Sequence, residues 1–281
     1  MKKLLAILLM LPLFVFAQGQ GQGQQNIPDE LKKLKWIEGP AAGKIGKNAS
    51  IQIPSGHAFL GDEDTGKFLE LMGNPPTNNH YLLAPKSLGW FAVFSFDESG
   101  YVKDDEKIDA DALLKQLKES DEPSNVERRK LGLETLVTDG WQVTPHYDEA
   151  TKQLEWGVRL KTAKGETNVN YTSRILGRSG VMSAVLVSDT EKLDADSREF
   201  KAALKSFTFE TGEKYSEFKT GDKVAQYGLA ALVLGGAAAV ATKKGFWTAI
   251  AAFIAAFWKI LAGVAVAAFA GLGSLFKKKK E

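Results

Sequence analysis

Three consecutive runs of alternating apolar and polar residues are the feature that most constrains the fold of this chain. The runs cover residues 141–147, 154–160 and 169–175. Short turns, at 148–151 and 163–166, separate them. Because successive side chains of a strand point to opposite faces, this period of two predicts three antiparallel strands joined by hairpins.

Shorter patterns on either side predict the rest of a folded domain. Apolar residues at helical spacing predict a helix that begins at Asp64 or Thr65 and ends at Gly73. Asp109 is expected to cap a second helix. A third helix at 200–207 and strands at 49–53, 90–96, 181–187 and 207–209 are also expected. We therefore predict the α+β class for residues 27–215, with an antiparallel sheet and flanking helices.

The alternation also predicts a polar face on this sheet. His146 occupies a polar position in the first run, Arg159 in the second and Arg174 in the third. The other members of the face are Gln142, Thr144, Asn168, Asn170 and Thr172. Water covers such a face in many antiparallel sheets. Helices packed over it would instead create a polar cleft whose groups need partners.

The first 17 residues have the pattern of a secretory signal peptide. Two lysines precede an uncharged stretch from Leu4 to Ala17, and small residues precede Gln18. An uncleaved membrane anchor is the alternative, although the stretch is short for a membrane span. Residues 18–26 are rich in Gly and Gln and are expected to form a flexible leader.

Two apolar segments, 224–241 and 246–276, dominate the end of the chain. The first would be about 27 Å long as a helix, close to the ~30 Å of a hydrocarbon core. We expect residues 216–281 to form a C-terminal membrane anchor, as a helical hairpin in which one or both segments cross. A buried soluble hairpin is the alternative. The expected membrane anchors are Trp247, Trp258, Lys259, Lys277, Lys278, Lys279 and Lys280.

Charge and composition exclude several functions. Residues 18–223 hold 27 basic and 33 acidic side chains, so nucleic acid is a poor partner for this part of the chain. The chain has no cysteine, which excludes thiol catalysis and cysteine-ligated metals. Its three histidines are far apart in the sequence and no phosphate-binding loop occurs, so we expect no metal and no cofactor. The expected partners are the lipid bilayer and an envelope protein.

Several short motifs occur in a familiar order. They are Gly73-Asn74, Gly100–Asp105, Asn125 with Arg128, Gly140-Trp141, Pro145–Asp148, Leu154–Trp156, Asn170-Tyr171 and Leu176–Arg178. Over about residues 40–275 the chain resembles the bacterial membrane-anchored proteins of domain of unknown function family 2167. The resemblance implies an envelope protein with a C-terminal membrane anchor, and it implies no reaction.

An acidic segment after the predicted strand 90–96 is the strongest candidate for a site. Residues 104–106 are three consecutive acids, and at a strand end they could face a ligand or share a proton. A solvated turn is the alternative. The candidate ligand-binding residues are Tyr101, Lys103, Asp104, Asp105, Arg128, His146 and Arg174.

These observations predict an envelope protein of the bacterial inner membrane, with its N-terminal domain exported. We expect this domain to be a non-enzymatic binding or interaction module. The alternative is a hydrolase-like enzyme that uses the acidic segment 104–106 with His146. Convergence of Asp104, Asp105, Arg128 and His146 in one pocket would favour the enzyme, and scatter would favour the binding module.

Overall fold

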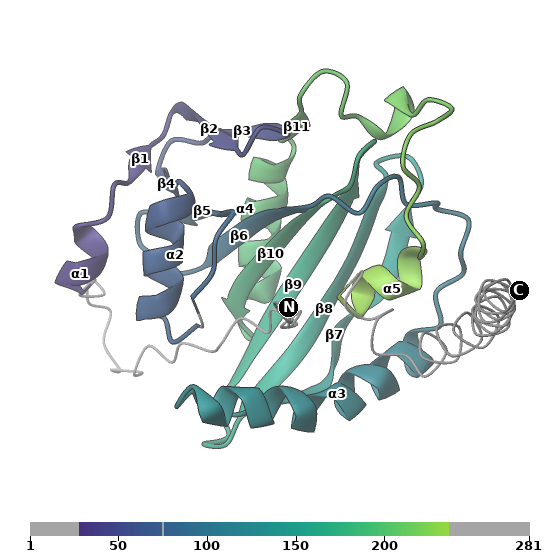
Figure 1. The fold of residues 1–281 in the computed structure, drawn as a ribbon. Helices are drawn as coiled ribbons and strands as arrows, with labels where there is room; N and C mark the ends of the chain where they lie inside the picture. The colour runs from purple at the N-terminus through teal and green to yellow at the C-terminus, as the bar shows by residue number, and fades with distance from the viewer. Residues whose placement is uncertain (1–27, 75, 236–281) are drawn as a thin grey trace, which may run out of the picture. The chain divides into compact units, whose positions relative to one another are not determined.

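An eight-stranded antiparallel sheet forms the centre of the fold, with the strand order β1-β4-β5-β6-β10-β9-β8-β7. The computed structural model describes residues 28–74 and 76–235 (Figure 1). A smaller sheet has the order β11-β3-β2. The strands are β1 (Ile37–Glu38), β2 (Ala41–Ile45), β3 (Ala49–Ile53), β4 (His57–Leu60), β5 (His80–Pro85), β6 (Phe91–Asp97), β7 (Leu136–Asp148), β8 (Gln153–Thr162), β9 (Thr167–Leu176), β10 (Val181–Asp189) and β11 (Thr208–Phe209). The helices are α1 (Asp29–Lys32), α2 (Asp62–Leu71), α3 (Ala110–Lys130), α4 (Leu193–Leu204), the 3-10 helix η1 (Tyr215–Glu217) and α5 (Leu229–Val233).

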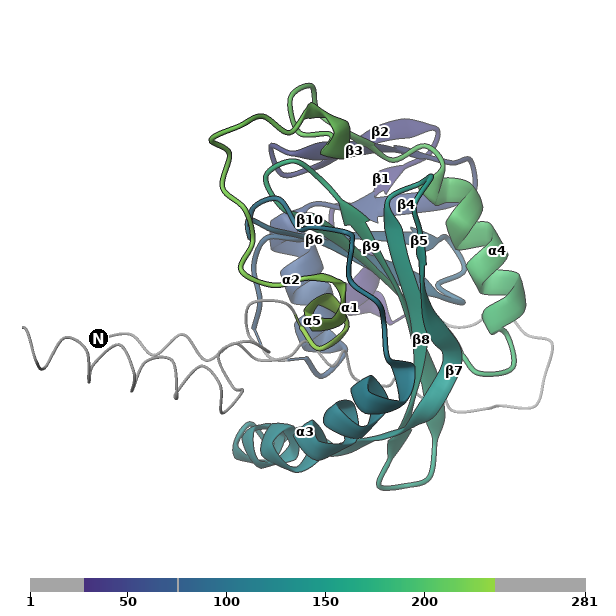
Figure 2. The ribbon, with the colours of Figure 1, turned by 90° about the vertical axis from the view of Figure 1, so that its right-hand side faces the viewer.

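Helix α4 and the small sheet cover one face of the large sheet (Figure 2). Phe200 and Leu204 of α4 are buried against apolar residues of β6, β9 and β10. Ile51 of β3 joins the same cluster and is fully buried. The apolar face of α4 therefore packs on the sheet, as expected for an amphipathic helix that buries one face.

The opposite face carries α2 towards one edge of the sheet, and α3 and α5 towards the other (Figure 2). Phe68 and Leu69 of α2 pack over β5 and β6. Leu113 and Leu117 of α3 pack into a separate cluster with Trp156 of β8. The two apolar clusters on this face are distinct, and polar side chains of the central strands lie between them.

Helix α2 begins earlier than the sequence predicted. Its first residue is Asp62, before both predicted caps, Asp64 and Thr65. Thr65 lies inside the helix, where its hydroxyl donates a hydrogen bond to the carbonyl oxygen of Leu60 at 3.1 Å. The hydroxyl is therefore satisfied by the preceding strand rather than by the first turn of the helix.

The predicted fold class, which ended in a C-terminal helical membrane hairpin, is wrong. The chain is mostly antiparallel sheet, and no helix within residues 28–74 and 76–235 has the length and hydropathy to cross a membrane. The described part of the first apolar segment contains only the short helix α5. Leu229 and Leu232 of α5 are each 1% exposed and pack against α3 and β8. Their apolar side chains thus complete the core of the domain, and the transmembrane prediction for this segment is not retained.

The second apolar segment, 246–276, and the signal-like residues 1–17 lie outside the described residues. The same holds for the predicted membrane anchors. They are Trp247, Trp258, Lys259, Lys277, Lys278, Lys279 and Lys280.

Candidate functional site

The segment between β11 and α5, residues 210–227, lies beside the ends of β6 and β9, and we call it the strap. An antiparallel bridge joins Gly177 to Lys214, and a parallel bridge joins Tyr101 to Val224. The N–H of Tyr101 donates to the carbonyl oxygen of Lys223 at 2.8 Å. The strap therefore belongs to the folded domain, although it extends beyond residue 215.

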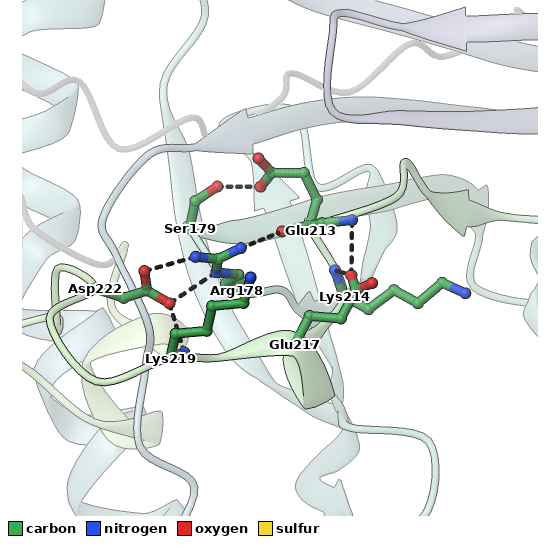
Figure 3. Close-up of polar contacts among 8 residues, drawn as sticks. Arg178, Ser179, Glu213, Lys214, Glu217, Lys219 and Asp222 are labelled. Atoms are coloured by element: carbon green, nitrogen blue, oxygen red, sulfur yellow. Dashed lines mark hydrogen bonds and ion pairs between the residues drawn. The ribbon is translucent and has the colours of Figure 1, made fainter.

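Arg178, in the turn after β9, holds two parts of the strap together (Figure 3). Its Nε and Nη2 atoms donate to the two carboxylate oxygens of Asp222 at 2.7 and 2.8 Å. Its Nη1 atom donates to the carbonyl oxygen of Gly212 at 3.2 Å. This bidentate geometry is the strongest form of an arginine–carboxylate pair. The Arg178 guanidinium and the N–H of Lys219 lower the pKa of Asp222 to about 2.

A polar cleft of about 510 Å³ opens beside this ion pair. Lys47 and Asn48 come from the turn between β2 and β3, and Glu98 follows β6. Ser179 and Glu213 also line the cleft, and the Ser179 hydroxyl donates a hydrogen bond to the Glu213 carboxylate (Figure 3). Six charged residues, three of each sign, line the cleft. They are Lys47, Arg178, Lys223, Glu98, Glu213 and Asp222.

Asp104 is the centre of a second polar cluster under the strap. Its Oδ2 atom accepts hydrogen bonds from the Tyr147 hydroxyl at 2.8 Å and from Lys152 Nζ at 2.7 Å. Its Oδ1 atom lies 3.0 Å from the Tyr215 hydroxyl, whose one proton is shared with the carbonyl oxygen of Val102 at 2.9 Å. The ring of Tyr101 stacks on that of Tyr215, with centroids 4.3 Å apart.

These contacts fix the protonation of the cluster. Burial acts to raise the pKa of Asp104, but hydrogen bonds from Lys152, Tyr147 and Tyr215 outweigh it and lower the pKa. Burial, followed by hydrogen bonding to their neighbours, raises the pKa values of Tyr147 and Tyr215. Asp104 is therefore held as a carboxylate and the two tyrosines as donors. A group fixed in this way holds the strap in place and is poorly suited to transferring protons.

The predicted acidic segment is divided between different contacts. Asp104 binds the strap, whereas Glu106 accepts the N–H of Ala230 at 2.9 Å and so caps the first turn of α5. Lys103 and Asp105 are exposed. Of the predicted candidates, only Tyr101 and Asp104 are brought together by this cluster.

The remaining candidates lie elsewhere. The Nε atom of Arg128 donates to the carbonyl oxygen of Glu134 at 2.5 Å, which holds the connection between α3 and β7. His146 is on the α4 face of the sheet, where its Nε2 atom lies 3.3 Å from the Oε2 atom of Glu155. Arg174 is on β9 and points to the opposite face. Asp104, Asp105, Arg128 and His146 therefore do not share a pocket.

The predicted single polar face is also divided. In the pairing of β8 with β9, Arg159 lies opposite Val169, whereas Arg174 lies opposite Leu154. Arg159 is thus on the α4 face and Arg174 is on the face of α2, α3 and α5. His146 pairs with Glu155, on the Arg159 side. The prediction was wrong because the hairpin registers, which the sequence does not show, decide which polar residues of neighbouring strands share a face.

Sequence reasoning also missed residues that build the cleft and the cluster under the strap. Arg178 and Asp222 are separated by 44 positions, and nothing local marks them as partners. Glu213 and Tyr215 lie in a segment without clear periodicity. The only local signal was Arg178 itself, which ends one of the motifs quoted above.

Three comparisons place the chain among known proteins. No curated protein matches the sequence. A solution structure of cyanobacterial PsbP (CyanoP) from Synechocystis sp. PCC 6803 is similar over 61% of this chain and 94% of that chain, at 9% identity. Its TM-score of 0.36 is too low to support any conclusion. A family model described as a protein of unknown function (DUF2167) matches residues 37–269. The match covers most of the sequence, and the chain therefore belongs to this family of unknown function.

Proposed function

We propose that this protein is an exported, non-enzymatic binding module that holds a segment of a partner protein in the cleft beside the strap. The observation that carries the proposal is the cleft itself, with a volume of about 510 Å³ and an even mixture of charged groups. The signal-like pattern of residues 1–17 supports export to the cell envelope.

The state of the titratable groups supports binding over catalysis. A hydrolase built from Asp104 and His146 needs both groups within reach of one bond. Asp104 is instead saturated by Lys152 and two tyrosines, and His146 lies on the other face of the sheet beside Glu155. The scatter of the candidate residues is the arrangement expected of a binding module.

The lining of the cleft indicates the chemistry of its occupant. Lys47 and Glu98, at its rim, are 3.2 Å apart and mostly exposed, with side-chain exposures of 79% and 67%. Such an exposed ion pair contributes little to stability and can be exchanged for contacts with a partner. A peptide segment that carries an acidic and a basic side chain could pair with Lys47 and Glu98 at the same time. A ligand with charges of only one sign would be repelled by the cleft residues of that sign.

Site-specific photocrosslinking tests this proposal. A photoreactive amino acid replaces Lys47 in the full-length protein, which is produced in its native cells and irradiated. The matched control carries the same group at Lys130, an exposed lysine of α3. We expect a discrete crosslinked product from position 47 only, and its loss when Glu98→Lys is added. Identical products from both positions, or none from position 47, would overturn the proposal.

Export is tested separately by the mass of the protein isolated from cell fractions. We expect a mature N-terminus at Gln18 in the envelope fraction. A cytoplasmic protein that retains residues 1–17 would contradict the exported location while leaving the crosslinking result interpretable.

A further inference from the structure

A row of polar side chains crosses the sheet on the face of α2 and α5. Strand pairing places His80 opposite Ser95, Ser95 opposite Ser183, and Ser183 opposite Arg174. Residues paired in this way share one face, so the four side chains form a line across β5, β6, β10 and β9. We call this line the polar row. Figures 1 and 2 show α2 and α5 on this face, on either side of β9 and β10.

The polar row continues along β9. Asn168, Asn170 and Thr172 alternate on the same face as Arg174, and each is at most 9% exposed. Ser183 is 4% exposed and His80 is 7% exposed. Ser95 and Arg174 keep part of their surface in contact with solvent. This concentration of buried hydrogen-bonding groups between two apolar clusters is unusual, because buried polar groups normally require partners.

Two atoms at the ends of the polar row have no such partner. The Nε of Arg174 and the Nε2 of His80 are both buried, and neither makes a hydrogen bond. Among the described residues, no carboxylate lies within 4.0 Å of the Arg174 guanidinium. Asp97 of β6, on the same face of the sheet, attracts the Arg174 charge from a longer distance and accepts a hydrogen bond from the hydroxyl of Tyr227 at 3.0 Å. The guanidinium therefore has an acid in its vicinity, but its buried Nε has no acceptor, which is costly, so a further anionic group is indicated at this end.

The contacts of His80 fix what its end of the row can accept. Its Nδ1 lies 2.6 Å from the carbonyl oxygen of Asn78 and 2.9 Å from the hydroxyl of Thr77. A carbonyl oxygen can only accept, so Nδ1 carries the proton. Burial lowers the pKa of His80, which keeps the ring neutral. Its Nε2 is consequently an acceptor and calls for a donor such as a hydroxyl group.

The two ends therefore require opposite groups. Three strand spacings separate the Cα atoms of His80 and Arg174, a distance of about 14 Å. A lone phosphate or acetate ion cannot serve both ends. We propose that the polar row binds a hydroxylated organic anion, such as a sugar acid or a sugar phosphate. Its acidic group pairs with Arg174, and its hydroxyl groups contact Ser183, Ser95 and His80.

Calorimetric titration of the full-length protein tests this inference. The probes are glucuronate and glucose 6-phosphate, and the two half-ligands are glucose, which has only the hydroxyl groups, and inorganic phosphate, which has only the anion. We expect a charged sugar to bind, and both half-ligands to bind at least about tenfold more weakly. Binding of glucuronate alone identifies a carboxylate ligand, and binding of glucose 6-phosphate alone identifies a phosphate ligand.

Two variants connect that binding to the polar row. Arg174→Met removes the charge at similar volume and is expected to weaken binding at least about tenfold. Arg174→Lys keeps a charge and is expected to weaken it less. The matched control is Arg159→Met, which removes an arginine from the opposite face and is expected to leave the affinity unchanged. If neither charged sugar binds, if glucose binds as tightly as they do, or if Arg174→Met binds normally, the inference is overturned.

Discussion

The strap cluster and the polar row both contain charged side chains beside tyrosines, yet their hydrogen bonding differs. Under the strap, Asp104 has three donors, and Arg178 makes a bidentate pair with Asp222. In the polar row, the Nε of Arg174 and the Nε2 of His80 have no partner. Satisfied networks fix a structure in one arrangement, whereas unsatisfied buried groups cost stability and are retained where a ligand uses them. The comparison indicates that the strap cluster stabilises the fold, whereas the polar row is a binding site.

The largest effect is expected in the strap cluster. Tyr215→Ala removes a ring that is 8% exposed, together with the donor to Asp104, and is expected to lower the free energy of unfolding by about 3–5 kcal/mol. Tyr215→Phe keeps the ring and is expected to cost about 1 kcal/mol. Urea denaturation of the full-length protein measures both. Equal effects of the two variants would show that the hydroxyl, not the packing of the ring, holds the strap.

The polar row should respond in the opposite direction. Arg174→Met replaces a guanidinium whose buried Nε has no acceptor by an apolar side chain and is expected to raise the free energy of unfolding by about 1–2 kcal/mol without ligand. The contrasting variant is Asp222→Met, which removes the carboxylate from the ion pair with Arg178 and is expected to destabilise the protein. If Arg174→Met is destabilising, Arg174 has a structural partner and the distinction between the two regions fails.

Parts of this fold follow from local sequence patterns. The alternating runs correspond to β7, β8 and β9 because a period of two is a property of each strand alone. Asp109 caps α3 for the same reason, since its Oδ1 accepts the N–H of Ala112, three residues on, at 3.0 Å. Such features need no knowledge of distant residues.

Other parts depend on contacts that no local pattern reveals. The register between β7 and β8 shifts three times, so the facing of β7 side chains cannot be counted along the sequence. The apolar residues of α5 fit a membrane helix and a buried helix equally well by hydropathy, and packing against α3 and β8 decides between them. The cleft depends on Arg178 meeting Asp222 across 44 positions. The cluster under the strap depends on Asp104 meeting Tyr215 across 111 positions.

Acid should weaken the strap cluster. The pKa of Asp222 is about 2 in the folded protein, below its ordinary value of 3.8, chiefly because of the hydrogen bonds from Arg178. A lowered carboxyl pKa stabilises the fold above the unfolded value, and that contribution is lost as the pH falls from about 4 to 2. The difference in stability between the natural protein and Asp222→Asn should therefore shrink over this range. A difference that stays constant with pH would show that the ion pair does not hold the strap.

The smallest effect concerns the neutral ring at the other end of the polar row. Burial holds the pKa of His80 below 6.5, so the unfolded chain takes up a proton before the folded one does. The fold should then lose stability as the pH falls below 6.5. His80→Asn keeps an N–H that can reach the carbonyl oxygen of Asn78 and removes the titrating ring, so this step should disappear.

His146→Asn, on the opposite face, should leave the step from His80 in place. If the step survives in His80→Asn, the ring is not held neutral by its surroundings. Its Nε2 would then be free to carry a proton, and the polar row would select a second acidic group at this end rather than a hydroxyl.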